Sequence, residues 1–315
     1  MVSENQINEI TSITKRRFGG FGDKFIAGFI FFNGITAILA MLLICIFLTK
    51  EALPLFSSVT LSEFLTGTEW DPLMEHYGIL PLIVGSLFVT IGAIIISIPI
   101  GIICAIYLAE VAPTWLREIL KPTIEILAGI PSVVLGFIGL TIVAPFLTAL
   151  LNLPIGLTAI TGSIALAFMA MPTIISISED AIVAVPKAYR DGSLALGATK
   201  WETIKGVVVP TAKSGIIAAC MLGVGRAVGE TMTVLMVTGN SPVLPDFETY
   251  GFAQGALNYF MTSVQTMTAT IALEMGEAAH QSLHYFSLFG IGLTLFAITF
   301  VINMIADLAL GKSRR

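Results

Sequence analysis

The chain has 315 residues, of which 56% are hydrophobic and only 12% are charged, and its mean hydropathy is +0.91. Soluble domains carry about a quarter charged residues, so this composition excludes a water-soluble globule. It also excludes a disordered chain, because disordered chains are poor in apolar residues and rich in charge. The 16 basic and 21 acidic residues give a net charge of −5, with no basic stretch that could neutralise a run of phosphates, which excludes nucleic-acid binding as the main role. A polytopic membrane protein remains.

Six apolar segments are long enough to cross a bilayer. A hydrocarbon core about 30 Å thick requires roughly 20 helical residues. None of the segments alternates polar and apolar residues with the period of two that a barrel strand shows, so they are predicted to be helices. The predicted spans cover, in chain order, 25–48, 80–109, 124–151, 155–177, 212–237 and 286–310. We therefore expect an all-α fold, with a six-helix transmembrane domain over 25–310 between a segment 1–24 and a tail 311–315.

The basic residues divide the connections between spans into two sides. All lysines and arginines except Lys50 and Arg226 lie before span one, after the even-numbered spans two and four, or after span six. Because Lys and Arg are retained on the cytoplasmic side, both termini are predicted to be cytoplasmic, which requires an even number of crossings. The stretch 262–275 is therefore predicted to be re-entrant or interfacial rather than a seventh span.

Helix-boundary residues mark the inward connection between spans four and five. Pro186 suits the first position of a helix, and Gly197 can end that helix in a left-handed conformation. Thr199 and Glu202 have the spacing of a capping box, which starts a second helix. The sequence predicts two short helices joined at a glycine corner, an elbow over about 186–210.

The residues of this elbow resemble the EAA loop of ABC-importer permeases. Asp191, Gly192 and Ser193 occupy the positions of Glu-Ala-Ala, and Gly197 and Pro210 are the expected glycine and proline at the expected spacing. Pro210 is expected to mark the start of the fifth span. In such permeases the elbow is the coupling helix that docks into a groove on the ATPase subunit. The resemblance implies that the residues facing the ATPase are Tyr189, Arg190, Asp191, Gly192, Ser193, Leu196 and Gly197.

A second interpretation of the elbow stays open. Tyr189, Leu194, Leu196 and Trp201 would also suit an amphipathic helix in the headgroup layer of the membrane, without a protein partner.

The sequence contains no catalytic motif. It lacks the Gly-x-x-x-x-Gly-Lys-Ser/Thr loop that cradles nucleotide phosphates, and no Ser/His/Asp or Cys/His constellation is evident. The chain is therefore predicted to be no enzyme and to need no cofactor, with ATP and Mg²⁺ bound by a separate ATPase. Glu277, His280 and His284 have a spacing that could hold a metal on one helix face, but a fourth ligand is missing and no metal site is expected.

The fifth span contains a charged pair. Arg226 and Glu230 are one helical turn apart, and a charge at mid-bilayer costs at least about 2.5 to 3.5 kcal/mol, so these side chains are expected to face a cavity or a partner. A structural Arg–Glu pair is one interpretation. An anion pathway is the other, because Gly223, Gly225 and Gly229 leave room beside a guanidinium whose fork suits an oxyanion.

Three motifs resemble the phosphate-importer permeases of the PstC type. They are Gly-Arg-Ala-Val-Gly-Glu-Thr-Met at 225–232, Leu-Ala-Gly-Ile-Pro-Ser-Val-Val at 127–134 and Thr-Met-Thr-Ala-Thr-Ile-Ala at 266–272, and the resemblance extends over about 23–307. It implies the six-helix MetI-like permease fold. The important intramembrane arginine and glutamate of that family correspond to Arg226 and Glu230, and the expected pathway also includes Ser132 and Thr231 from the same motifs.

The resemblance also implies partners and a place in the cell. A PstC-type permease pairs with a PstA-type permease over a dimer of PstB-type ATPases, and a PstS-type protein delivers phosphate to it. The expected location is the cytoplasmic (inner) membrane of a bacterium or archaeon. The outer connections contain many acidic residues and a single lysine, Lys50, which disfavours capture of free anions and favours delivery by a binding protein. Alternatives are a permease for another oxyanion such as molybdate or sulfate, the PstA-type partner, and a secondary anion transporter or channel.

Overall fold

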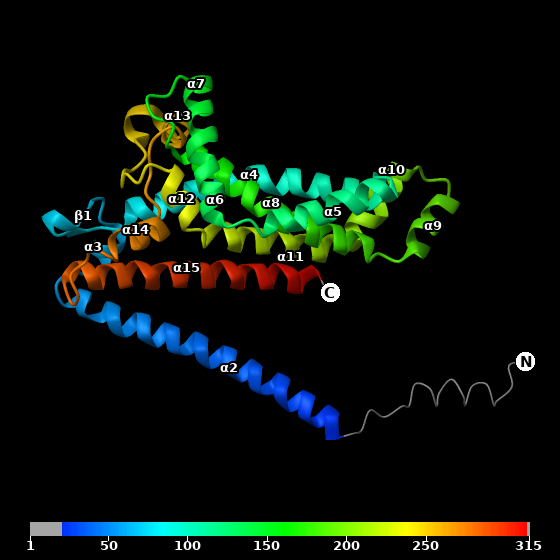
Figure 1. Ribbon diagram of the computed structural model, residues 1–315, viewed down its shortest axis with the longest axis horizontal. Coiled ribbons are helices and arrows are strands. Elements are labelled where there is room, and N and C mark those ends of the chain that lie inside the picture. Colours follow the sequence, from blue (N-terminus) through cyan, green and yellow to red (C-terminus); the bar gives the residue numbers. More distant parts are fainter. Residues whose placement is uncertain (1–20, 314–315) are drawn as a thin grey trace, which may run out of the picture. The chain divides into compact units, whose positions relative to one another are not determined.

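The computed structural model describes residues 21–313, and almost all of this part of the chain is helical (Figure 1). Residues 1–20 of the predicted N-terminal segment and residues 314 and 315 of the predicted tail lie outside the described residues.

Six helices of the described part are long and apolar enough to cross a membrane, which confirms the predicted number of spans. They cover Phe25–Ser57, Leu80–Val111, Ser132–Leu151, Ala159–Val183, Lys200–Val228 and Leu283–Ile305.

The chain divides into two compact units at Leu48. The first unit contains most of helix α2 (Phe21–Ala52), whose apolar side chains from Phe25 to Phe47 are largely exposed. A helix that is apolar all round is typical of a span that faces lipid or another membrane subunit.

The second unit contains the other five spans. The segments that build them are α4 (Leu80–Ile106) with the π-helical turn η3 (Tyr107–Val111); α6 (Ser132–Ile138), the π-helical turn η4 (Gly139–Val143) and α7 (Ala144–Leu151); α8 (Ala159–Val183); α10 (Lys200–Thr203), the π-helical turn η5 (Ile204–Val208) and α11 (Val209–Val228); and α15 (Leu283–Ser313).

Shorter elements lie at the two ends of this unit (Figure 1). We call one end the hairpin end, since it carries the strands β1 and β2, and the other the α9 end. The elements at the hairpin end are η1 (Leu53–Ser57), α3 (Leu61–Thr66), β1 (Trp70–Asp71), η2 (Pro72–Met74), β2 (His76–Tyr77), α12 (Met232–Val237), α13 (Phe247–Phe260) and α14 (Met267–Glu274). Those toward the α9 end are α5 (Thr114–Ala128) and α9 (Lys187–Ala195).

Helix α8 is the centre of the bundle, because it packs against α4, α5 and α11. A side chain at Gly92 of α4 would overlap Ser163 of α8, so glycine allows the two helices to approach closely. The Ser163 hydroxyl then contacts two carbonyl groups, those of Ala159 at 2.8 Å and Val89 at 3.2 Å. Small residues and a satisfied hydroxyl thus hold α4 and α8 together.

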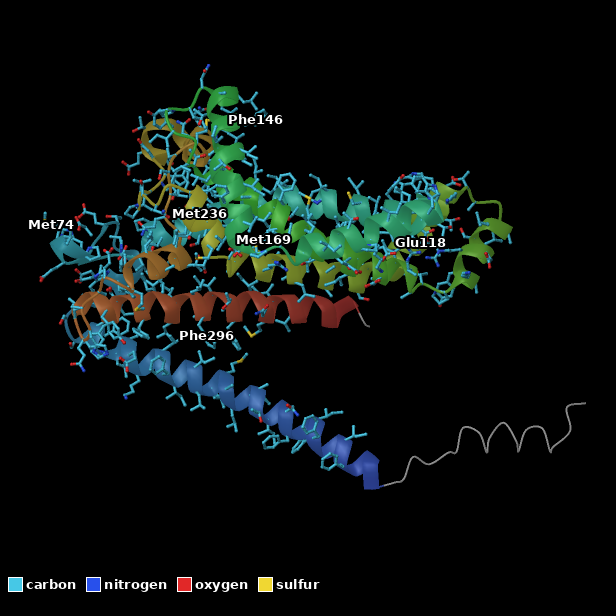
Figure 2. All side chains as sticks on the ribbon, viewed as in Figure 1. Met74, Glu118, Phe146, Met169, Met236 and Phe296 are labelled. Carbon is cyan, nitrogen blue, oxygen red and sulfur yellow. The ribbon has the colours of Figure 1, made fainter. Side chains whose placement is uncertain are left out.

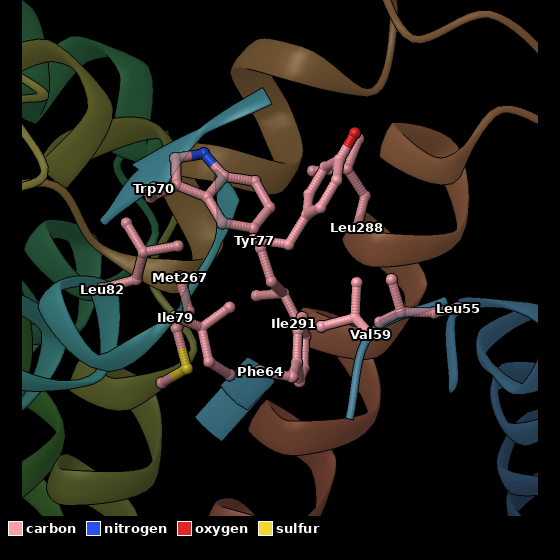
Figure 3. Packing of buried hydrophobic residues seen from close by; sticks show 10 residues of the cluster. All are labelled: Leu55, Val59, Phe64, Trp70, Tyr77, Ile79, Leu82, Met267, Leu288 and Ile291. Carbon is pink, nitrogen blue, oxygen red and sulfur yellow. The ribbon is translucent and has the colours of Figure 1, made fainter. Parts of the chain in front are cut away.

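A second core lies under the two-stranded hairpin (Figure 3). β1 and β2 pair antiparallel, with Trp70 opposite Tyr77, and both rings are buried. Glu274 of α14 accepts a hydrogen bond from Trp70 Nε1 at 3.1 Å, and its other oxygen lies 2.8 Å from His284 Nε2 of α15. His284 therefore pairs with Glu274 and not with Glu277, the residue of the hypothetical metal spacing.

Two predicted spans extend across a helix break, and the observed span covers only one side of it. The third begins at Ser132 rather than at residue 124, because the chain breaks over 129–131 and α5 forms a separate helix. Pro131 has no N–H to donate to a preceding turn, which ends the helix before it. The fifth span ends at Val228 rather than at residue 237, and α12 follows after a break over 229–231.

The start of the fifth span is also different from the prediction. Pro210 does not begin a helix, because the helix starts at Lys200 and runs through the π-helical turn η5 into α11. A proline cannot donate to the carbonyl four residues earlier, and the wider hydrogen-bond spacing of a π-helical turn accommodates that gap.

The stretch 262–275 does not form a span, as predicted. Its helix α14 has only eight residues and begins at an N-cap, where Thr266 Oγ1 accepts a hydrogen bond from Ala269 N at 3.3 Å. The first turn is buried against the rest of the unit, in agreement with a segment whose backbone is shielded by protein.

Candidate functional site

Two helix breaks and the start of a third helix lie close together in the second unit. The break over 129–131 separates α5 from α6, and the break over 229–231 separates α11 from α12. α12 contacts both α6 and α14. Figure 2 shows this region beside the labelled Met169 of α8 and Met236 of α12. Broken helices expose backbone N–H and C=O groups that need partners, so polar side chains are expected here.

Arg226 lies in the last turn of α11, at the edge of this region. Its Nη2 donates a hydrogen bond to the carbonyl oxygen of Ala128, the last residue of α5, at 3.1 Å. The carbonyl end of a helix carries partial negative charge, which stabilises a nearby cation. A guanidinium has five N–H donors, and within residues 21–313 this is the one hydrogen bond that Arg226 makes. The side chain is half-buried, so its other donors remain accessible.

Glu230 lies in the break and points into the protein. Glu230 is 8% exposed, and its Oε1 accepts a hydrogen bond from the backbone N–H of Thr233 at 3.0 Å, which caps the start of α12. Its backbone carbonyl accepts from Thr268 Oγ1 of α14 at 2.8 Å. The Arg226–Glu230 pair, one of the two interpretations of this charged segment, is not formed among the described residues. The four-residue spacing puts two side chains on one face only in a continuous helix, and α11 ends before Glu230.

Ser132 and Thr231, the other predicted pathway residues, lie one in each break region. The Ser132 carbonyl accepts a hydrogen bond from Thr233 Oγ1 at 3.1 Å, which joins α6 to α12. Thr231 is half-buried between α11 and α12. The breaks therefore bring Arg226, Ser132 and Thr231 to one region and turn Glu230 away into the core.

The three glycines near Arg226 have different surroundings. An added side chain at Gly225 would have no atom within 4 Å, so this face of α11 is open. At Gly223 it would overlap Ile174 of α8, which makes Gly223 a helix-packing residue. The expected space beside the guanidinium thus exists at Gly225 and not at Gly223.

Thr233 and Thr268 were missed by sequence reasoning. Thr233 donates to the carbonyl of Ser132, the first residue of α6, and Thr268 donates to the carbonyl of Glu230 in the break between α11 and α12. Their signal in the sequence was a threonine-rich stretch beside a break motif, but the carbonyls that they contact lie 101 and 38 residues away.

The predicted elbow is present at the α9 end. Gly197 has φ +86° and turns the chain after α9. Thr199 and Glu202 form the predicted capping box, with Thr199 N donating to Glu202 Oε2 at 2.8 Å and Glu202 N to Thr199 Oγ1 at 3.3 Å. The second helix of the elbow is the first turn of the fifth span rather than a separate helix.

The predicted coupling residues divide into two groups. Most of them are exposed at the tip of the elbow, and Leu196 is 91% exposed. Two face inward: Ser193 Oγ lies 3.0 Å from Thr203 Oγ1 of α10, and Arg190 binds acceptors on two other spans. The exposed members are Tyr189, Asp191, Gly192, Leu196 and Gly197.

An ion network joins α5 to α8 near the same end. Glu179 of α8 is 1% exposed and pairs with Arg117 and Lys121, and Lys121 Nζ also lies 2.5 Å from Asp180. Burial lowers the pKa of Lys121, but the hydrogen bonds to Asp180 and Glu179 outweigh that effect and raise it above its ordinary value. Lys121 is therefore a cation at neutral pH.

Broken membrane helices, an intramembrane arginine and an exposed elbow define a membrane transport permease. Residues 97–313 match the model of the binding-protein-dependent transport system inner membrane component, and the chain belongs to this family. It is thus a multi-pass inner-membrane protein and a transport component rather than an enzyme.

Curated relatives agree with the predicted resemblance to PstC-type permeases. The chain is 42% identical over 270 residues to the probable ABC transporter permease protein YqgH of Bacillus subtilis, covering 84% of this chain and 83% of that one. It is 36% identical over 263 residues to the phosphate transport system permease protein PstC of Mesorhizobium japonicum (78% and 76% covered). It is 34% identical over 272 residues to PstC of Xylella fastidiosa, with 80% of each chain covered.

Solved structures share the fold. The chain is similar to a bacterial ABC transporter involved in the import of the acidic polysaccharide alginate, with a TM-score of 0.59 and 14% identity over 90% of this chain and 96% of that one. It is also similar to the inward-facing MetNI methionine ABC transporter, with a TM-score of 0.54 and 17% identity over 78% of this chain and all of that one. The predicted MetI-like permease fold is confirmed.

Proposed function

We propose that the chain is the membrane-spanning permease subunit of an ATP-driven importer that receives inorganic phosphate from a binding protein and releases it into the cytoplasm. Relatives named phosphate transport system permease support this function over most of the chain's length. The observation that carries it in this chain is Arg226, a half-buried intramembrane cation at the meeting point of two helix breaks with most of its donors accessible.

The guanidinium suits this role chemically. Its planar fork donates two parallel hydrogen bonds to a tetrahedral oxyanion, and charge-assisted bonds of this kind are roughly twice as strong as neutral ones. The carbonyl of Ala128 holds one end of the fork in place. Among residues 21–313, the contact that compensates the Arg226 charge is the carbonyl end of a helix, and a cation in this state attracts an anion into an otherwise apolar membrane region.

The orientation and partners follow from charge and from the elbow. The α9 end carries the basic connections and is assigned to the cytoplasm, where the exposed elbow docks on a PstB-type ATPase dimer that binds ATP and Mg²⁺. The acidic hairpin end is assigned to the outer side, where a PstS-type protein delivers phosphate. A PstA-type permease completes the pathway beside the open face of α11 at Gly225.

Arg226→Gln tests the proposal. Loss of a charge-assisted hydrogen bond costs about 1.5–3 kcal/mol, so phosphate uptake should fall roughly 10- to 100-fold. Arg226→Lys, which keeps the charge without the fork, should give an intermediate loss. The measurement is uptake of radiolabelled phosphate by proteoliposomes that contain the complete complex.

Lys213→Gln is the matched control, because Lys213 is an exposed cation on the same helix, and its uptake should equal that of the wild type. Uptake retained in Arg226→Gln would contradict the proposed role. Guanidinium chemistry fits sulfate and molybdate as well, so both are added as competitors. If either of them suppresses phosphate uptake at equal concentration and is itself imported faster than phosphate, the preferred cargo is that oxyanion.

A further inference from the structure

Arg190 of α9 is turned away from the surface on which the ATPase is expected to dock. Its Nε and Nη2 donate to Glu110 Oε1 at 2.9 and 2.6 Å. Nη1 donates to the carbonyl of Val185 at 2.5 Å, and Nη2 also donates to the carbonyl of Ile182 at 2.8 Å. The guanidinium thus uses all three of its nitrogens within the chain.

These acceptors belong to two different spans. Glu110 lies in η3, at the end of the span that contains α4, whereas Ile182 and Val185 lie at and just after the end of α8. One side chain therefore joins α9 to both spans. The carbonyl end of α8 also favours a cation at this position.

Burial makes this contact stronger than an exposed surface pair. The side chains of Arg190 and Glu110 are 19% and 10% exposed, respectively. Exposed ion pairs contribute little because solvent screens them, but a forked arginine with several acceptors and little solvent holds one geometry. A residue whose role is to contact the ATPase would be exposed, as Tyr189 and Leu196 are.

The same end of α8 leads on to the candidate site. Glu179 pairs with Arg117 and Lys121 of α5, and α5 ends at Ala128, whose carbonyl accepts from Arg226. These polar contacts, together with the turns of α8 and α5 that separate them, connect the elbow to the intramembrane arginine.

We propose that Arg190 and Glu110 form a clamp that makes α9 move as one body with the ends of α4 and α8, so that movement of the ATPase reaches the helix breaks at Arg226. Arg190 is a positioning residue in this assignment and not an ATPase contact. The clamp rests on the proposed function, because it requires an ATPase that acts on the elbow.

The test uses Arg190→Gln and Glu110→Gln in the complete complex, with Lys213→Gln as the control that removes an exposed charge. Three quantities are measured: the amount of assembled complex, the rate of ATP hydrolysis, and the number of ATP molecules hydrolysed per imported phosphate. Both clamp variants should assemble and hydrolyse ATP, while the ATP consumed per phosphate rises about fivefold or more. The control should keep the wild-type ratio.

Two results would overturn the clamp. If uptake falls only in proportion to the amount of assembled complex, at an unchanged ratio of ATP to phosphate, Arg190 and Glu110 serve stability alone. If Arg190→Gln weakens binding of the ATPase while Glu110→Gln does not, Arg190 is a docking residue.

A second readout does not depend on the cargo. Spin labels are placed at Lys187→Cys on α9 and Ile103→Cys on α4, in a chain whose Cys45, Cys104 and Cys220 are replaced by alanine, within the assembled complex. The distance between the labels should keep one narrow distribution with and without ATP, and should broaden in Arg190→Gln. A distribution that is unaffected by Arg190→Gln would overturn the clamp. If the wild-type complex hydrolyses ATP without importing phosphate, the proposed function fails, and the distances still decide whether the clamp exists.

Discussion

Glu179 shows how a buried carboxyl group is supplied with partners in the interior of a membrane bundle. A buried charge is costly unless it is paired and hydrogen-bonded, and Glu179 pairs with Arg117 and Lys121 of the neighbouring helix α5. Because the pKa of Lys121 is raised above its ordinary 10.5, the stabilisation from this cation is complete at neutral pH and is lost only as the pH rises through the raised value.

Replacing Glu179 by Gln should destabilise the permease. Breaking a buried pair costs about 3–5 kcal/mol, but both cations here are partly exposed and can turn toward solvent, so we expect roughly 2 kcal/mol. Thermal unfolding of the detergent-solubilised protein measures the change. The control is Asp180→Asn, since Asp180 is the next residue and is 63% exposed. An equal loss in both variants would show that burial of Glu179 is unimportant.

At the scale of single residues, the sequence was sufficient to single out Arg226 as an intramembrane charge but not to predict the surroundings of Glu230. A lone basic residue within an apolar run has no topological role, and this signal was sufficient to single out Arg226. The partner of Arg226 could not be inferred, because the spacing of four residues assumes a continuous helix. The carbonyl that Arg226 contacts belongs to Ala128, 98 residues away.

At the scale of helices, close approach between α4 and α14 positions one wall of the candidate site. A Cβ on Gly85 of α4 would overlap the carbonyl oxygen of Gln265, just before α14. α14 in turn supplies Thr268, which binds the Glu230 carbonyl. Absence of a side chain at Gly85 therefore allows α14 to reach the break between α11 and α12.

Gly85→Ala should displace the start of α14. Overpacking of this kind costs about 1–3 kcal/mol, and the midpoint of thermal unfolding should fall together with phosphate uptake. Gly28→Ala is the matched control, because a side chain at Gly28 in α2 would have no atom within 4 Å. Unchanged stability in Gly85→Ala would mean that α14 can shift without loss.

Proline and glycine in the sequence indicated where a helix is perturbed, but not whether it breaks there or continues through a π-helical turn. The pair Gly129 and Pro131 breaks the helix, whereas Pro210 follows the π-helical turn η5 and leaves the helix unbroken. Local sequence cannot separate these outcomes, because the alternative hydrogen-bond spacing depends on what packs around the turn. The existence of each span was predictable from composition, but the ends that lie at a helix break or a π-helical turn were not.

At the scale of the whole molecule, the two ends of the bundle are assigned to opposite sides of the membrane. The hairpin end presents Leu73, which is almost fully exposed, and the α9 end presents the elbow. The positive-inside rule assigns the elbow to the cytoplasm.

Labelling with a membrane-impermeant maleimide tests this orientation in a chain without its native cysteines. Leu73→Cys should react in intact spheroplasts, whereas Leu196→Cys should react only after permeabilisation, which is the control for access of the reagent. Both side chains are highly exposed, so differences in reactivity report the side of the membrane. The reverse pattern would contradict the assigned topology.

Six spans and the elbow were predictable because each depends on a local stretch of sequence. The contacts that connect the ends of the molecule were not, since Lys121 and Glu179 are 58 residues apart and Arg190 and Glu110 are 80 apart. Such pairs have no periodicity or spacing to reveal them, and only the folded arrangement brings α5 to α8 and α9 to η3.

The π-helical turn η5 has a geometric consequence for the elbow. A π-helical turn contains one residue more than an α-helical turn, and each residue of an α-helix advances the chain by about 100° around the axis. Because η5 holds that extra residue within one turn, the residues before it lie about 100° around the axis from the positions that a regular α-helix continued back from α11 would give them. The face that each residue of α10 presents is thus set by the extra residue of a single turn.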